Sequence, residues 1–113
     1  MRPALTIRAA RDGPVSTLIL RGELDANEAS GLLSQAAVIV DSQTERLVLD
    51  LAGLAFLDCA GARALAVAAS FAPAGCPVII RSLNHKVRRV LDLLSLDLAI
   101  EEPGDFRRTI YVH

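Results

Sequence analysis

The chain has 113 residues, 52% of them hydrophobic and 22% charged, and its formal net charge is −1. This length and composition predict one folded domain, residues 1–113, and exclude an intrinsically disordered protein. The near-zero charge gives no reason to expect nucleic acid as a partner, and the two cysteines are too few for a disulfide framework or a zinc site.

The cellular location is predicted from the distribution of apolar residues. The first residues alternate polar and apolar side chains and contain no signal-peptide core. The most apolar stretch, residues 59–75, is interrupted by Arg63 and Pro73 and is short for a bilayer. We therefore expect a cytoplasmic protein that does not insert directly into a membrane.

Two strands are predicted at the start of the chain. Apolar residues alternate with polar ones over residues 5–9, and a second strand covers residues 15–21. The connection Asp12-Gly13-Pro14 is so short that it permits only an antiparallel hairpin. We expect residues 22–25 to end the second strand.

A helix is predicted next, because apolar residues recur at its characteristic spacing. They are Ala29, Leu32, Leu33, Ala36, Ala37 and Val40. Asp25 or Asn27 is available to cap its first turn. The near-continuous apolar run 47–51 then predicts a strand covered on both faces.

The rest of the chain alternates helices and strands. A short turn leads to an alanine-rich helix from about residue 60 to residue 71, and residues 78–80 form a short buried strand. Asn84 is expected to cap a further helix. Residues 98–100 predict a last strand and 105–112 a terminal helix. The fold class is therefore α/β, with a single mixed sheet of about four to five strands packed by three to four α-helices.

The most informative tract is Asp58-Cys59-Ala60-Gly61, where a strand gives way to a helix. The N–H groups at a helix N-terminus suit a phosphate or a carboxylate. The minimum role of Asp58 is to cap this helix. Gly61 permits either the close approach of a partner or tight packing of the helix on the sheet, and the sequence does not separate the two. The alanines leave the helix apolar nearly all round, so it is either buried or half-covered by a partner.

The order of elements resembles the STAS domain, a family that includes bacterial anti-sigma factor antagonists and cytoplasmic domains of sulphate transporters. The similarity rests on Gly22-Glu23-Leu24-Asp25, on Leu49-Asp50-Leu51 followed by residues 56–61, and on the leucine-rich segment 84–97. It covers residues 5–100. In the antagonists the hydroxyl residue directly before the glycine is phosphorylated by a serine kinase that is also the anti-sigma factor.

Carried over by position, the resemblance assigns Asp58 to the family's acid, Cys59 to its first serine, Ala60 to the phosphoacceptor and Gly61 to the glycine. Ala60 has no oxygen to phosphorylate. The resemblance also implies partner contact at Asp25. The predicted partner-binding residues are Glu23, Asp25, Asp58, Cys59, Ala60, Gly61 and Arg63.

Two functions from different classes remain open at this point. The first is a regulator that resembles an anti-sigma factor antagonist and docks a kinase-type anti-sigma factor without phosphorylation at Ala60. The second is an accessory subunit of an ABC-type lipid transporter, docked on the transport ATPase. A homodimer through the alanine-rich helix is a further expectation.

Enzyme activity is not expected. The sequence carries no nucleophile elbow, P-loop or dinucleotide-binding motif. The two histidines, His85 and His113, have no evident nucleophile or metal-ligand partner in the sequence. No cofactor and no metal are predicted.

Overall fold

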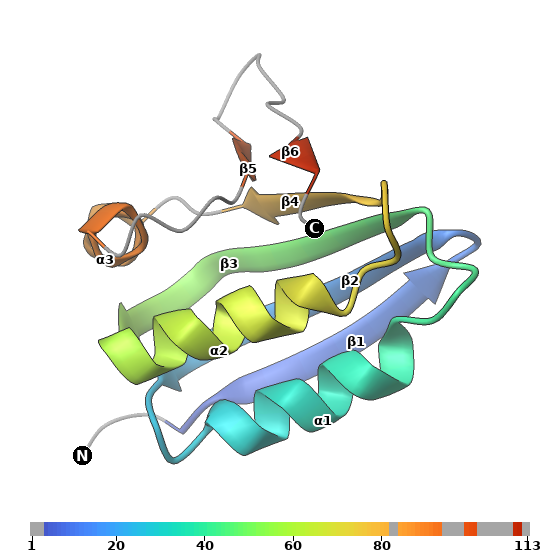
Figure 1. Ribbon diagram of the computed structural model, residues 1–113. Helices are drawn as coiled ribbons and strands as arrows, with labels where there is room; N and C mark the ends of the chain where they lie inside the picture. Colours follow the sequence, from blue (N-terminus) through green and yellow to red (C-terminus); the bar gives the residue numbers. More distant parts are fainter. Residues whose placement is uncertain (1–3, 82–83, 94–98, 102–109, 112–113) are drawn as a thin grey trace.

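The computed structural model describes residues 4–81, 84–93, 99–101 and 110–111, and its strands form one sheet (Figure 1). The strand order is β1-β2-β3-β4-β5, with β6 also paired to β4. The strands are β1 (Thr6–Asp12), β2 (Val15–Leu24), β3 (Arg46–Leu57), β4 (Pro77–Arg81), β5 (Ala99–Glu101) and β6 (Ile110–Tyr111). β2 to β5 are parallel neighbours, while β1 is antiparallel to β2 and β6 to β4. The predicted single mixed sheet is confirmed.

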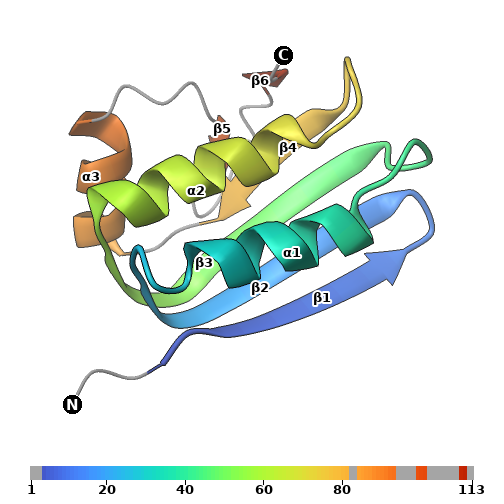
Figure 2. The same cartoon turned by 60° about the horizontal axis from the view of Figure 1, so that its bottom comes forward.

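Three helices are found in the described part of the chain: α1 (Ala29–Ile39), α2 (Cys59–Ser70) and α3 (His85–Leu93). α1 and α2 lie side by side across one face of the sheet (Figure 2). α3 contacts β3 and α2. Side chains from all three helices and from β2, β3 and β4 form one buried apolar cluster. Because α2 packs on this face, its first turn lies beside the ends of β2 and β3.

Local sequence explains the starts of several elements. Gly13 takes a positive φ of 58° in the two-residue turn that places Asp12 opposite Val15, as predicted for a hairpin. The side chain of Asn84 accepts hydrogen bonds from the N–H groups of Lys86 (2.8 Å) and Val87 (3.4 Å), which confirms the predicted cap of α3. Its amide nitrogen also donates to the carbonyl of Leu54, 3.3 Å away, and so ties α3 to β3.

The predicted end of β3 is wrong, because the strand runs past the apolar run 47–51 to Leu57, whereas β2 ends at Leu24, within the predicted residues 22–25. Glu23 pairs with Phe56 and Leu24 with Leu57, after register shifts in the preceding residues. Gly22 lies at one of these shifts with a φ of 102°. Glycine tolerates this conformation, so the strand bends at Gly22 and continues. The short turn expected between residue 51 and Asp58 is instead strand.

The predictions for the C-terminal part are partly corrected. The last strand, expected over residues 98–100, is found at Ala99–Glu101, and Leu98 lies outside the described residues. The terminal helix expected over 105–112 is wrong at Ile110 and Tyr111, which form β6 against Val78 and Pro77. A β-branched and an aromatic residue favour a strand at this position. The remainder of that segment, 105–109 and 112, lies outside the described residues.

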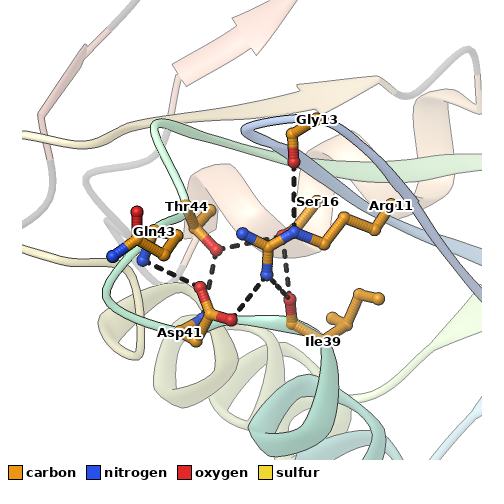
Figure 3. A network of polar contacts seen from close by, with 7 residues as sticks. All are labelled: Arg11, Gly13, Ser16, Ile39, Asp41, Gln43 and Thr44. Atoms are coloured by element: carbon orange, nitrogen blue, oxygen red, sulfur yellow. Dashed lines mark hydrogen bonds and ion pairs between the residues drawn. The ribbon is translucent and has the colours of Figure 1, made fainter.

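A polar network joins the β1–β2 hairpin to the loop after α1 (Figure 3). The guanidinium of Arg11 donates to Asp41 (2.7 Å) and to the carbonyl of Gly13 (3.1 Å). The hydroxyls of Ser16 and Thr44 lie 3.1 Å apart, and both residues are buried. Ser16 donates to the carbonyl of Ile39 at the last turn of α1 (2.8 Å). The network fixes the end of α1 against the sheet, at the end opposite the start of α2.

None of the helices in the described ranges is both long and apolar enough to cross a membrane.

Candidate functional site

The candidate site lies where the carboxyl ends of β2 and β3 meet the start of α2. Parallel neighbouring strands end at the same edge of a sheet, and here the ends are matched in register, with Leu24 opposite Leu57. The N–H of Asp58 donates to the carbonyl of Leu24, 3.4 Å away. The predicted residues Glu23, Asp25 and Asp58 are therefore brought to one end of the molecule by the strands that carry them.

Asp58 caps α2, as predicted. Its backbone is extended and its Oδ1 accepts a hydrogen bond from the N–H of Gly61, 2.7 Å away. The carbonyl of Asp58 accepts the first backbone bond of the helix, from Ala62 (2.9 Å). This arrangement satisfies one of the N–H groups left open by the first turn and holds the carboxylate half-buried beside it.

The start of α1 differs from the prediction that Asp25 or Asn27 caps it. Glu28 occupies the cap position and makes no side-chain hydrogen bond there. Asp25 instead accepts from the N–H groups of Asn27 (2.9 Å) and Glu28 (3.3 Å) through Oδ1. Its carboxylate thus closes the turn between β2 and α1. Asp25 is half-exposed in this turn.

The structure decides between the two roles left open for Gly61. Gly61 is buried, and a Cβ built on it would lie 2.4 Å from the carbonyl oxygen of Leu24 and 2.9 Å from Cδ1 of Leu57. Any side chain here would collide with the end of β2. Gly61 therefore acts by letting α2 pack closely on the sheet.

α2 is buried on one side and exposed on the other. Ala62, Leu65, Ala68 and Ala69 are fully buried, so the alanines let a peripheral helix sit deep against the sheet. The exposed side carries Cys59, Arg63, Val67, Ser70 and Phe71. Val67 is 45% and Phe71 39% exposed, and neither was predicted as a site residue. They follow Arg63 by four and eight residues, a spacing that places all three on one side of a helix, but the spacing does not indicate whether that side is buried or exposed.

The comparisons with known proteins decide the family. The family model described as "Mlab, STAS domain" matches residues 7–101. The chain belongs to the STAS domain family. A sequence search of curated proteins found no match.

Two solved STAS-type structures have the same fold. An anti-sigma factor antagonist from Mycobacterium paratuberculosis superposes with a TM-score of 0.79 at 23% identity, covering 89% of this chain and 87% of that one. The anti-sigma factor antagonist SpoIIAA in its unphosphorylated form gives 0.70 at 13% identity, covering 87% of this chain and 90% of that one. At these identities the likeness establishes the fold.

The surface of this STAS domain around the start of α2 combines acids with one cation and an exposed thiol. We call it the α2-start surface and define it as Glu23, Asp25, Asp58, Cys59, Ala60 and Arg63. Cys59 and Arg63 are exposed, and the other four are half-buried. Within the described ranges, no group of three or more histidine, cysteine or acidic side chains is arranged to hold a metal ion.

The described titratable groups with a shifted pKa lie away from this surface. The Arg11 guanidinium, hydrogen-bonded to Asp41, lowers the pKa of that carboxyl. Burial raises the pKa of the Cys76 thiol at the turn before β4. Neither group belongs to the α2-start surface.

Proposed function

We propose that this STAS domain acts by binding a partner protein, without catalysis, and that its partner is a kinase-type anti-sigma factor. The observation that carries the proposal is the α2-start surface: β2, β3 and α2 hold its acids and Arg63 at one end of the fold. Two of these acids are fixed by backbone hydrogen bonds, Asp25 in its turn and Asp58 at its cap. A partner therefore meets charges that are already ordered, which reduces the entropic cost of binding.

The exposed side of α2 extends this surface. Arg63 is followed at intervals of four residues by Val67 and Phe71, both partly exposed. An apolar centre beside charged residues is the usual composition of a protein-binding surface. We propose that the partner covers this side of α2 together with the α2-start surface.

Release by phosphorylation does not operate at the position that the family resemblance indicates. Ala60 has no hydroxyl to accept a phosphoryl group, and it is followed by the buried Gly61. A phosphate there would add roughly 1.5 to 2 negative charges beside Asp58. We propose that binding is constitutive, or controlled by abundance, a ligand or another chain.

A second candidate function is an accessory subunit of an ABC-type lipid transporter that docks on the transport ATPase. It is favoured by Ala60, because such a subunit needs no phosphoacceptor. The description of the matched family names Mlab, whereas the similar solved structures are described as anti-sigma factor antagonists. Family membership is therefore compatible with either partner.

The experiment is affinity capture of the tagged protein from its native cells, followed by mass spectrometry, with charge variants as probes. A substitution at Gly61 such as Gly61→Arg is unsuitable as a probe of binding, because the new side chain would collide with Leu24 and disturb the fold. Arg63→Glu changes an exposed side chain of the proposed surface, and Arg89→Glu is the matched control on α3. We expect Arg63→Glu to weaken capture while Arg89→Glu leaves it unchanged.

The identity of the captured protein separates the two candidates. An ATP-binding anti-sigma kinase that is lost with Arg63→Glu supports the first function, and Ala60→Ser should then make release dependent on phosphorylation. A transport ATPase with its permease supports the second. Capture of neither, or capture unchanged by Arg63→Glu, contradicts a partner at the α2-start surface.

A further inference from the structure

The outer side of β1 is one edge of the described sheet. β1 (Thr6–Asp12) pairs with β2 on one side and with no described strand on the other (Figure 2). Six of its seven residues are exposed, and Ala9 and Ala10 at its centre are small. Unpaired N–H and C=O groups along such an edge are a template for another strand.

We propose that this edge pairs antiparallel with β1 of a second copy of the chain, in the one register that places Ala10 opposite Ala10. The resulting dimer has a continuous sheet, and Arg8 of each copy lies opposite Asp12 of the other. The inference is independent of the proposed function, because the α2-start surface belongs to other elements.

The hairpin decides which backbone groups are available at the edge. In a two-residue turn the flanking pair, here Asp12 and Val15, exchanges both backbone hydrogen bonds. Hydrogen-bonded and non-hydrogen-bonded pairs alternate along an antiparallel ladder. Even-numbered residues of β1 therefore direct N–H and C=O toward β2, while Ile7, Ala9 and Arg11 direct theirs to the free edge.

This alternation restricts the registers of a symmetric pair. Outward-directed residues must face outward-directed residues, so odd-numbered positions pair with odd ones and even with even. The two-fold axis of the dimer then passes beside one residue, and that residue lies opposite the same residue of the second chain. A pairing of Arg8 with Arg11 of the other copy is excluded, because one of these residues directs its backbone inward.

Charge selects among the permitted registers. An axis at Arg8 or at Arg11 places identical cations opposite each other, which is unfavourable. An axis at Ala9 places Arg8 opposite the uncharged Ala10, so this register gains no attraction between opposite charges. An axis at Ala10 brings Arg8 opposite Asp12 twice, in non-hydrogen-bonded pairs whose side chains lie closest.

The contacts within one chain leave these two charges available. Arg11 is occupied by Asp41 and the carbonyl of Gly13. In contrast, the side chains of Arg8 and Asp12 make no hydrogen bond or ion pair in the structure described. Arg8 lies beside Arg21 in a shallow hollow of about 220 Å³, so an acid from a second copy would relieve a cation pair. In the proposed register the small Ala9 faces Arg11, which leaves the contact of Arg11 with Asp41 undisturbed.

The dimer is expected to be weak, because one strand edge buries less area than a stable interface requires. The test is sedimentation velocity of the full chain over a wide range of concentrations, at low and high salt. We expect a concentration-dependent dimer that salt weakens. Arg8→Asp should weaken association at least about tenfold, and Arg8→Asp combined with Asp12→Arg should restore it.

Ala9→Pro is the backbone variant. Its N–H points to the free edge, so proline removes a bond of the dimer and leaves the β1–β2 ladder intact. We expect a folded monomer, with the fold checked by circular dichroism. A wild-type monomer at every concentration overturns the proposal. So does a dimer that is unaffected by Ala9→Pro, or one that the charge exchange does not restore.

Discussion

Gly61 and Leu24 are in direct backbone contact: a Cβ on Gly61 would lie 2.4 Å from the Leu24 carbonyl oxygen. The contact joins the first turn of α2 to the end of β2. The neighbouring N–H of Asp58 donates to the same carbonyl (3.4 Å), and the N–H of Gly61 donates to the carboxylate of Asp58 (2.7 Å). The positions of Leu24, Asp58 and Gly61 are thus mutually dependent, and the shape of the α2-start surface depends on the absence of one methyl group.

Gly61→Ala should destabilise the domain by about 1–3 kcal/mol, because the added methyl group forces α2 away from the sheet. Gly31→Ala is the matched control: Gly31 lies exposed in α1, and a Cβ there meets no atom within 4 Å. It should stabilise the domain by about 0.5–1 kcal/mol through its better helix propensity. Urea unfolding measures both variants, and a Gly61→Ala variant as stable as the wild type would refute the contact.

Asp58 combines a structural and an electrostatic role that substitutions can separate. Asp58→Ala removes the oxygen that accepts from Gly61, and should cost about 1 kcal/mol of unfolding free energy. Asp58→Asn keeps a capping oxygen but removes the charge, so its stability should stay near that of the wild type. If the α2-start surface binds a partner through its acids, Asp58→Asn should nevertheless reduce the measured affinity. Equal stability losses in both variants would contradict this separation.

The local features of the fold could be predicted from the sequence, because they depend on neighbouring residues. The caps at Asp58 and Asn84 and the turn at Gly13 follow from residue types that act within three positions. The burial of β3 on both faces at residues 47–49 likewise follows from an unbroken apolar run. The family resemblance was confirmed by the match over residues 7–101.

The features that the sequence did not predict depend on contacts between distant residues. The extension of β3 past residue 51 requires the end of β2 as a pairing partner, and the role of Gly61 requires the carbonyl of Leu24. Val67 and Phe71 could be placed on the exposed side of α2 only once its buried side was known. Nothing in the sequence indicates that Arg11 and Asp41 meet, because they are isolated charges 30 residues apart.

The buried hydroxyl pair in the polar network predicts a measurable loss of stability. The N–H of Asp41 donates to Thr44 and the hydroxyl of Ser16 to the carbonyl of Ile39, so Thr44 is left to donate to Ser16. Ser16 is 0% exposed, and Ser16→Ala leaves the Thr44 hydroxyl without its acceptor. We expect a loss of about 1–3 kcal/mol in urea unfolding. The exposed Ser34→Ala, in α1, serves as the control and should have almost no effect.

The ion pair between Arg11 and Asp41 predicts a dependence of stability on pH. The pKa of Asp41 is lowered from 3.8, chiefly by the hydrogen bond from Arg11. A lowered folded-state pKa stabilises the protein above about pH 3.8 and loses that effect as the pH falls through the folded value. The effect should be small, because the pair is exposed to solvent.

Asp41→Asn removes this titration. Its stability should lie slightly below that of the wild type at neutral pH and converge with it in acid, as measured by the urea midpoint against pH. A difference that stays constant across the acid range would contradict a stabilisation that depends on the charge of Asp41.

The two cysteines should differ in their reactivity. Cys59 is exposed at the start of α2, whereas Cys76 is buried, with its Sγ 3.6 Å from the carbonyl of Pro77. Burial raises the pKa of Cys76 above 9.0, so little of it is thiolate at mildly alkaline pH. Iodoacetamide should therefore modify Cys59 in the native protein and Cys76 only after unfolding. In the Cys59→Ser variant only Cys76 can react with iodoacetamide. The rate of this reaction should rise with urea in step with global unfolding. Fast labelling of Cys76 in the native Cys59→Ser variant would contradict its burial.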